Sequence, residues 1–300
     1  MNKDSLVSVV VATYRRKHEL VRALNSLSNQ SYKNLEILLV DDCGNDEWNK
    51  TVEEIFQEYI FLNPDIKIKK IVNAKTLGSA VSRNVGIEAS IGEYVTFLDD
   101  DDVYMPDKIK NQLNFMVENN LDYTITNLDL YYENGKLSER RKRHYIKSFD
   151  SKSLIRYHMM YHMTGTDVLM FKRSYLIKIG CFPKIDVGDE FYLMESAILS
   201  GGSFGYLDCC DVMAYVHASG IGLSSGKGKI DGENFLYNYK KKYFKDFDYK
   251  SVKYIKMRHY AVLAFANFKE KKYIRCLLNS FVSFISSPIM FCKLVFGNSR

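Results

Sequence analysis

Strand-like and helix-like segments alternate through the first hundred residues, and this alternation restricts the fold more than any other feature. Short apolar runs of strand length are separated by segments whose apolar residues recur at helical spacing. The expected strands are 6–13, 35–42, 66–72 and 93–100, and the expected helices are 17–30, 49–62 and 78–90. Strands joined by helices in this way form a parallel sheet with helices on both faces. The sequence therefore predicts a Rossmann-like α/β fold.

The second half of the chain predicts an extension of the same domain, followed by helices. The expected elements are a helix at 107–119, a strand at 122–131, a hairpin turn at 133–136, a strand leading into a helix at 165–174, a helix at 189–202 and a strand at 211–220. A Gly- and Ser-rich loop at 219–232 is typical of either a lid or a mobile connector. With helices from about residue 230, the predicted fold class is a mostly parallel central sheet plus a C-terminal helical extension.

Composition and charge exclude several classes of protein. The 300 residues are 46% hydrophobic and 26% charged, as in globular chains. A net charge of +6 without a nucleic-acid motif argues against a nucleic-acid partner. The six cysteines lack zinc-type spacing, and the N-terminal apolar run is too short for a signal peptide. We therefore expect a cytoplasmic protein with reduced thiols.

Polar residues follow three of the expected strands. They are Thr13, Tyr14 and Arg15 after the first, Asp41 and Asp42 after the second, and the run from Asp99 to Asp102 after the fourth. Ligands of open parallel sheets bind beyond the carboxyl ends of the strands, so we expect these residues along one crevice. The first strand is not followed by GxGxxG, which argues against an ordinary dinucleotide fold.

The four consecutive aspartates at 99–102 repel one another unless a positive group lies beside them. Carboxylates are hard oxygen ligands that suit Mg²⁺ or Mn²⁺. The spacing Asp99-x-Asp101 allows one side chain to reach a metal while the other reaches a bound ligand. The alternative is a solvated acidic turn that caps the next helix, which we favour for Asp107.

Four stretches, taken together and in order, resemble family 2 glycosyltransferases of the GT-A fold. They are VSVVVATYRR at 7–16, ILLVDDCGND at 37–46, SRNVGIEASIGEYVTFLDDDD at 82–102 and GDEFYL at 188–193. Each is weak alone, whereas the ordered set is specific, and the resemblance is strongest over about residues 5–130. It implies a GT-A catalytic domain at 1–228, with a nucleotide-sugar-binding half at 1–130 and an acceptor-binding half at 131–228, followed by a helical region at 229–300.

The resemblance also implies which residues bind the donor. They are Thr13, Tyr14, Arg15, Asp41, Asp42, Arg83, Asp99 and Asp100. Tyr14 is expected beside the base, Arg15 near phosphate or ribose, and Asp41 as an acceptor for the base or ribose. Two alternatives stay open, since Asp42 would also serve as a loop cap and Arg83 as an ordinary ion-pair partner.

A divalent cation, Mn²⁺ or Mg²⁺, is implied as a bridge between the two phosphates of the donor. The family pattern assigns Asp101 to the cation, Asp99 to the ribose or metal, and His217 to the metal from the loop after the last strand. Such a cation neutralises the charge that develops on the leaving nucleoside diphosphate.

The general base of the family lies in an acidic pair at the start of a helix, and Asp189-Glu190 matches it. The order of the two residues is reversed, so the spacing to Gly201 favours Glu190 while the residue type favours Asp189. Acidic residues that only stabilise a helix N-terminus are the alternative. A single base is sufficient for direct displacement with inversion.

The predicted function is an inverting, metal-dependent glycosyltransferase. Its donor is expected to be a UDP-sugar, and its acceptor a hydroxyl of a saccharide or lipid-linked sugar in surface polysaccharide biosynthesis. The alternatives are a nucleotidyltransferase and a non-catalytic nucleotide- or sugar-binding protein. The segment ATYRRKHE has no glycine, which argues against the first, and the intact Asp101 argues against the second.

The C-terminal stretch 276–296 carries one charge, Lys293, and its length approaches that of a membrane span. Its serines, Asn279 and Pro288 lower the hydrophobicity, so we expect an interfacial amphipathic helix. Residues 270–297 would then contact the inner face of the cell membrane. Packing against the catalytic domain is the alternative.

Overall fold

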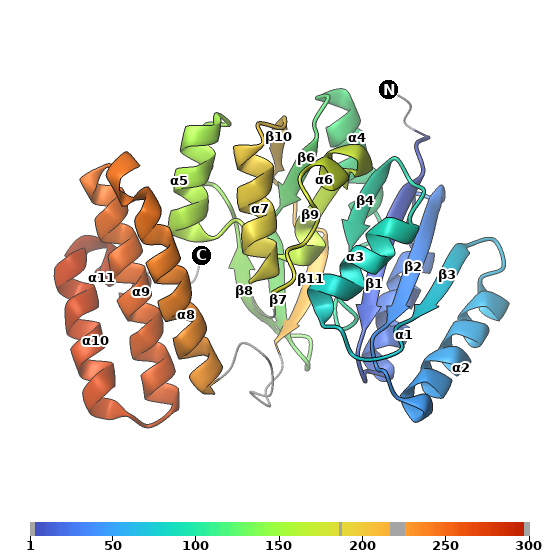
Figure 1. Cartoon of the computed structure of the whole chain (residues 1–300), viewed down its shortest axis with the longest axis horizontal. Coiled ribbons are helices and arrows are strands. Elements are labelled where there is room, and N and C mark those ends of the chain that lie inside the picture. Colours follow the sequence, from blue (N-terminus) through green and yellow to red (C-terminus); the bar gives the residue numbers. More distant parts are fainter. Residues whose placement is uncertain (1–3, 186–187, 217–225, 297–300) are drawn as a thin grey trace. The chain divides into compact units, whose positions relative to one another are not determined.

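The structure is a computed structural model that describes residues 4–185, 188–216 and 226–296 (Figure 1). The chain divides into two compact units. The first consists of Met1–Ser151 and Met163–Val216, and the second of Lys152–His162 and His217–Arg300. Both sheets belong to the first unit, whereas the described part of the second unit is helical.

A seven-stranded sheet forms the centre of the first unit (Figure 1). Its strands, in spatial order, are β10 (Phe204–Leu207), β6 (Tyr123–Thr126), β9 (Leu169–Lys172), β4 (Tyr94–Phe97), β1 (Val7–Thr13), β2 (Leu35–Asp41) and β3 (Lys67–Val72). Neighbouring strands are parallel except at β9, which runs antiparallel to both β4 and β6. The predicted mostly parallel α/β sheet is therefore confirmed.

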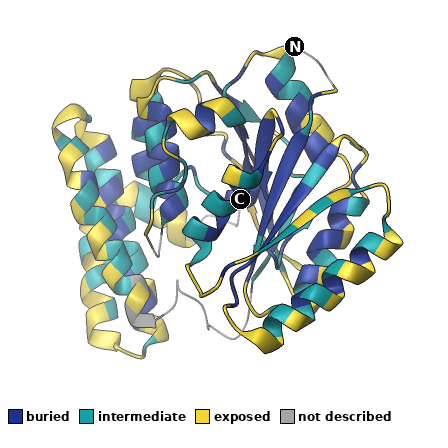
Figure 2. Ribbon diagram, turned by 45° about the vertical axis from the view of Figure 1, so that its right-hand side comes forward, coloured by how far each residue is buried: buried dark blue, intermediate teal, exposed yellow. Residues whose placement is uncertain are grey.

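Three helices connect the first four strands of this sheet. They are α1 (His18–Ser28), α2 (Asp46–Leu62) and α3 (Ser79–Ala89). The chain moves from β1 through β2 to β3 and then returns across β1 to β4, so right-handed crossovers place α1 and α2 on one face and α3 on the other. Side chains of α1 and α2 line one small cavity, in agreement with this arrangement. Because both faces are covered, β1 and β2 are largely apolar and buried (Figure 2).

A smaller four-stranded sheet follows the order β5 (Val103–Tyr104), β11 (Val212–Val216), β7 (Leu128–Tyr132) and β8 (Leu137–Arg141). The prediction of one strand at 122–131 is wrong, because β6 and β7 belong to different sheets. Asn127 lies at the break, where its side chain donates to Asp208 and its N–H donates to the carbonyl of Cys209. These bonds satisfy Asn127 outside either ladder. The predicted hairpin is confirmed by the antiparallel pairing of β7 with β8.

Short helices complete the first unit. They are α4 (Lys108–Glu118), the 3-10 turn η1 (Thr166–Val168), α6 (Arg173–Lys178) and α7 (Asp189–Leu199). The predicted helices at 107–119 and 189–202 are thereby confirmed, as is the strand at 165–174 that enters a helix.

The second unit is built from helices, which confirms the predicted C-terminal helical extension. They are α5 (Ser151–Tyr161), α8 (Gly226–Lys240), the 3-10 helix η2 (Lys241–Asp246), α9 (Tyr249–Lys269), α10 (Tyr273–Ser286) and α11 (Pro288–Phe296). Residues 226–232, predicted as loop, instead begin α8, while 219–225 lie outside the described residues. Over the described ranges, none of the helices combines the length and apolar character needed to cross a membrane.

Candidate active site

Hydrogen bonds to Asp100 join the ends of β1 and β4. The Thr13 hydroxyl donates to Asp100 Oδ2 at 2.8 Å, and the Tyr14 N–H donates to the same atom at 3.1 Å. Arg16, which sequence analysis did not identify, donates to Asp100 Oδ1 at 2.7 Å. Burial raises the pKa of Asp100 to about 6, against the opposing effect of Arg16. Three of the predicted donor-binding residues therefore lie together at one edge of the sheet.

Tyr14 and Arg15 form the exposed part of this edge. The Tyr14 ring is 46% exposed, and the guanidinium carbon of Arg15 lies 5.1 Å from its centroid. Arg15 has a φ of 55°, a left-handed conformation that is uncommon for a residue other than glycine. Such conformations persist where the surrounding structure holds them, often at functional sites. A half-exposed ring here offers a face on which a nucleotide base can stack.

The two aspartates at the end of β2 have different surroundings. Asp41 is fully buried and accepts a hydrogen bond from the backbone N–H two residues further on, at 3.0 Å. Asp42 accepts from the N–H groups of Leu77 and Gly78, each at 2.8 Å, and from the Asn73 amide at 2.8 Å. These bonds hold the loop that leads into α3. The loop-capping contact, which was the alternative reading of Asp42, is thus present.

Arg83 of α3 connects two acidic segments that are distant in sequence. Its NH2 donates to Asp99 Oδ1 at 2.6 Å, and its NH1 donates to Asp189 Oδ2 at 2.9 Å. Burial alone would lower the pKa of Arg83, but the carboxylates of Asp99 and Asp189 outweigh it and raise that pKa above the ordinary value. The arginine is therefore charged and holds the loop after β4 against the start of α7.

The last two aspartates of the run at 99–102 also differ from each other. Asp101 Oδ2 lies 2.6 Å from Arg16 NH1, and its backbone carbonyl accepts from Arg22 at 2.6 Å. Asp102 Oδ1 accepts from the N–H of Tyr215 in β11 at 3.0 Å. Cationic and N–H donors thus already offset part of the repulsion within the run.

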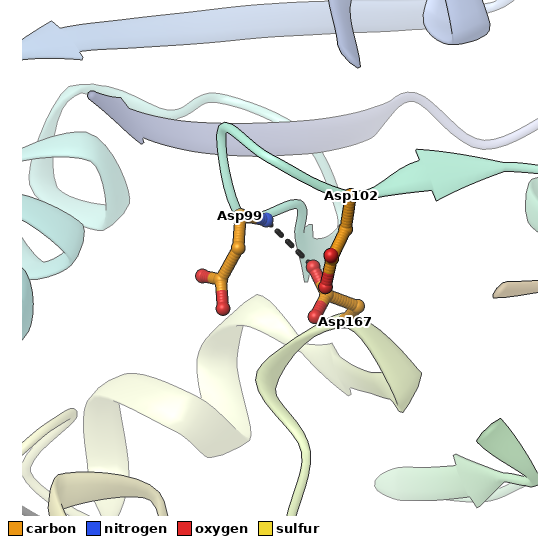
Figure 3. A group of neighbouring side chains, drawn as sticks. All are labelled: Asp99, Asp102 and Asp167. Carbon is orange, nitrogen blue, oxygen red and sulfur yellow. Dashed lines mark hydrogen bonds between the residues drawn. The ribbon is translucent and has the colours of Figure 1, made fainter. Parts of the chain in front are cut away.

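Asp99, Asp102 and Asp167 form a carboxylate cluster with the geometry to hold a metal ion (Figure 3). One oxygen of each lies within 4.8 Å of the others, and the Asp99 N–H donates to Asp167 Oδ1 at 2.6 Å. Burial, with help from the neighbouring carboxylates, raises the pKa of Asp167 to about 8 and also raises the pKa of Asp102. Bound protons or a hard divalent cation such as Mg²⁺ or Mn²⁺ relieve such repulsion, so the donor set fits a cation. The predicted ligand Asp101 is not part of this cluster.

Asp167 was not predicted as a site residue because sequence does not reveal the direction of β9. In an all-parallel sheet, the start of one strand and the ends of its neighbours lie at opposite edges. Because β9 is antiparallel to β4, the residues just before β9 lie beside those that follow β4. Gly165, with a φ of 121°, allows the turn that brings Asp167 to this edge.

The acidic pair at the start of α7 lies at the same place, with a different partner for each residue. Asp189 is bonded to Arg83, whereas Glu190 Oε2 accepts from the Thr166 hydroxyl at 2.8 Å. Burial raises the pKa of both carboxyls. The guanidinium of Arg83 opposes this rise for Asp189, while the Thr166 hydroxyl that donates to Glu190 is a neutral group.

His217, the third predicted metal ligand, lies outside the described residues, and the preceding strand β11 ends at Val216. Arg16 and Thr166 are site contacts that sequence analysis missed. Arg16 could have been identified from the sequence, because it lies in the same segment after β1 as the predicted residues Thr13, Tyr14 and Arg15. Thr166 had no such signal, because it reaches the site through the antiparallel course of β9.

Comparison with known sequences identifies the family. The model of glycosyl transferase family 2 matches residues 8–180. An uncharacterized glycosyltransferase of Haemophilus influenzae is 30% identical over 227 residues, which cover 75% of this chain and 84% of that protein. The Escherichia coli UDP-Glc:alpha-D-GlcNAc-diphosphoundecaprenol beta-1,3-glucosyltransferase WfgD is 26% identical over 229 residues, or 75% of this chain and 82% of that protein. An uncharacterized glycosyltransferase of Rickettsia conorii is 37% identical over 136 residues, so the match spans 45% of this chain but 21% of that relative.

Comparison with solved structures identifies the fold. Residues 1-349 of Staphylococcus aureus TarS in complex with UDP-GlcNAc align with a TM-score of 0.61 and 17% identity, over 96% of this chain and 83% of that chain. The mannosyltransferase PcManGT from Pyrobaculum calidifontis, in complex with GDP-Man and Mn²⁺, aligns with a TM-score of 0.60 and 16% identity, over 97% of this chain and 78% of that chain. At such low sequence identity, the structural similarity supports the GT-A fold alone. The family is shown by the sequence match, which covers more than half of the chain. This chain belongs to glycosyl transferase family 2.

Proposed function

We propose that this protein is an inverting glycosyltransferase that moves a sugar from a nucleotide-diphosphate donor to an acceptor hydroxyl. The observation that carries the proposal is the position of Arg83, which bonds Asp99 after β4 and Asp189 at the start of α7. The guanidinium of Arg83 therefore links the expected donor-binding side of the site to the side that carries the expected general base. Transfer requires both sides to be fixed around the same sugar, because the reacting atoms must be held in line.

The donor is proposed to lie along the carboxyl ends of β1, β2 and β4. Tyr14 would stack on the base, Asp41 would accept from base or ribose, and Arg15 would meet ribose or phosphate. The supporting residues are Thr13, Asp42, Arg83 and Asp100. A uridine nucleotide is favoured because the TarS complex holds UDP-GlcNAc and the name of WfgD specifies UDP-Glc.

We propose that Mn²⁺ or Mg²⁺ binds beside the donor diphosphate. Asp99 is the proposed common ligand, since it belongs both to the D-x-D spacing with Asp101 and to the cluster with Asp102 and Asp167. Asp101, now ion-paired with an arginine, would exchange that partner for the cation, and His217 is proposed as a further ligand. The cation would neutralise the charge that develops on the leaving diphosphate.

Glu190 is the proposed general base. Arg83 holds Asp189 in an ion pair at 2.9 Å, and this pairing opposes the rise that burial causes in the pKa of Asp189, so Asp189 is better suited to position Arg83. Burial raises the pKa of Glu190, which makes it a stronger base than an exposed glutamate. The Thr166 hydroxyl, at 2.8 Å, orients its carboxylate. Attack by an acceptor hydroxyl that Glu190 deprotonates is a single displacement with inversion.

The acceptor is proposed to be a saccharide or a lipid-linked sugar of a surface polysaccharide. The name of WfgD specifies a diphosphoundecaprenol acceptor, which supports the lipid-linked form. We assign donor binding to residues 1–130, acceptor binding to 131–228 and a helical accessory region to 229–300. The proposed place of action is the cytoplasm at the inner face of the cell membrane.

The proposal is tested by screening a panel of sugar nucleotides for release of nucleoside diphosphate, with Mn²⁺, with Mg²⁺ and with a chelator. We expect release from at least one UDP-sugar with a cation present and loss of release with the chelator. Release of pyrophosphate in a parallel assay with a nucleoside triphosphate and a sugar 1-phosphate would instead indicate a nucleotidyltransferase. Donor binding without any turnover across donors and saccharide acceptors would indicate a binding protein.

A further inference from the structure

Helix α10 packs its polar side against α9 and leaves its apolar side exposed. Its buried residues are Ser283 and Ser286, and the Ser283 hydroxyl donates to the backbone carbonyl of Met257 in α9 at 2.7 Å. At about 100° per residue, Cys276 and Ser280 fall on the same side as Ser283. A helix of a water-soluble protein usually does the reverse, with apolar residues inside. Small side chains at helix contacts are typical of helices that face lipid.

The opposite side of α10 presents large apolar side chains. Ile274 is 77% exposed, Leu277 71% and Phe281 62%. This surface, named the apolar face, consists of Ile274, Leu277, Leu278, Phe281, Phe284 and Ile285. Its members recur at intervals of three and four residues, so they form one stripe. Helix α11 beside it also exposes Ile289, Leu294 and Val295. Contiguous apolar surface of this kind marks a site of contact with another molecule or a membrane.

Basic residues gather at the N-terminal end of the apolar face. Lys269, Lys271, Lys272 and Arg275 are all exposed. Residues 249–296 contain nine Lys and Arg and one acidic residue, Glu270, which is paired with Lys272. A cationic margin beside an apolar stripe is complementary to anionic lipid headgroups above an acyl layer.

Two other arrangements fit these observations less well. A second copy of the chain on this face would bring two strongly basic segments, residues 249–296 of each copy, close together, which is unfavourable. Spanning a membrane is excluded for α10, whose 14 residues extend about 21 Å, less than the roughly 30 Å of a hydrocarbon core.

We propose that the apolar face is a docking surface for a membrane rich in anionic lipid. Helix α10 lies parallel to the bilayer, with its apolar face in the acyl boundary and Lys271, Lys272 and Arg275 at the level of the headgroups. The inference deepens the proposed location at the inner membrane face by naming the surface responsible. Lipid binding is measured without donor or acceptor, so its failure would leave the proposed transfer reaction unaffected.

The test is flotation of the full chain with vesicles of phosphatidylcholine alone and of phosphatidylcholine mixed equally with phosphatidylglycerol. We expect binding to the mixed vesicles to be at least about tenfold stronger, and to weaken at high salt. The double variant Leu277→Glu with Phe281→Glu should lose at least about tenfold in binding, because its side chains no longer enter the acyl layer. The separate variant Lys271→Gln with Arg275→Gln should lose the preference for phosphatidylglycerol while keeping the apolar face.

Phe61→Glu on α2 is the matched control, since Phe61 is 83% exposed on the first unit, and it should bind as the wild type does. Absence of flotation, equal binding to both vesicle types, or wild-type binding by the Leu277 and Phe281 variant would overturn the proposal. Light scattering would also overturn the proposal if it detected a dimer of the wild type that is absent in the Leu277 and Phe281 variant. Such a result would assign the apolar face to a second copy of the chain.

Discussion

The strands of the first unit and helix α10 of the second distribute apolar side chains in opposite ways. In β1 and β2 the apolar residues are buried, and polar groups collect where the strands end, at Thr13 and Asp41. In α10 the buried residues are two serines, and the large apolar side chains face outward. The strands therefore follow the rule for a soluble core, whereas α10 follows the rule for a helix in contact with lipid.

This difference separates residues that stabilise the fold from residues that serve a contact. Burial of apolar surface is the main favourable term in folding, so an exposed leucine contributes little to the stability of the chain. The apolar face of α10 is therefore better explained by a partner than by the stability of the second unit. Substitutions of the same residue type in the two regions make this comparison testable.

The largest effect is expected for Leu38→Ala in the centre of β2. Leu38 is fully buried, so its truncation leaves a cavity and should lower the free energy of unfolding by about 2–5 kcal/mol. Urea denaturation of the variant and the wild type measures the difference. A loss below about 0.5 kcal/mol would mean that this part of the sheet is not the packed core described above.

The pH dependence of stability should reveal Lys108, a buried lysine of the first unit. Its ammonium group donates to Thr96 and Tyr104, and burial lowers the pKa of Lys108 from its ordinary 10.5 to about 7. Between these two values the unfolded chain binds more protons than the folded chain. The free energy of unfolding should therefore rise with pH in this window, by up to about 1.4 kcal/mol per pH unit from this group.

Lys108→Met should remove that slope, as measured by urea denaturation at pH 7, 8 and 9. Lys110→Met on the same helix is the control, because Lys110 is exposed and the variant should keep the wild-type slope. Equal slopes for the Lys108 variant and the wild type would show that Lys108 retains its charge in the folded chain.

A smaller effect is expected for Ser283→Ala at the contact of α10 with α9. The substitution leaves the carbonyl of Met257 without the hydroxyl donor and should lower the free energy of unfolding by about 1 kcal/mol. Denaturation followed by a fluorescent label on the second unit isolates this effect. An unchanged midpoint would argue that the serine side of α10 is not the packed side.

The smallest effect is expected for Leu278→Ala on the apolar face. Because Leu278 is exposed, the free energy of unfolding should change by less than about 0.5 kcal/mol, in contrast to Leu38→Ala. Denaturation followed by the fluorescent label on the second unit measures this change. A loss as large as that of Leu38→Ala would show that the face is buried within the chain and would remove the contrast between the two regions.

Strands β1, β2 and β4 were predictable from sequence because both of their faces are covered, which produces continuous apolar runs such as VSVVVAT. The edge strand β3 was predictable from its alternating pattern, KIKKIV. Strand β5 has only two residues and β10 only four, so neither carries a periodic signal. Helix α5 was missed as well. The break at Asn127 depends on hydrogen bonds to residues 208 and 209, which no local pattern reveals.

The candidate site was predictable where it follows parallel strands. The rule that ligands bind beyond strand ends identified Thr13, Asp41 and the run at 99–102. It did not identify Asp167, because the direction of β9 is set by tertiary pairing. Nor did it distinguish Asp189 from Glu190, whose difference lies in the contacts with Arg83 and Thr166.

The most direct test of the central claim is a comparison of donor binding and sugar transfer in Glu190→Gln. Calorimetry with the donor that the screen identifies gives the affinity, and nucleoside diphosphate release in the presence of acceptor gives the rate. Glu47→Gln, an exposed glutamate of α2, is the matched control. We predict that Glu190→Gln binds the donor within about threefold of the wild type and transfers sugar about 10²–10⁴-fold more slowly. Transfer at the wild-type rate would contradict the account.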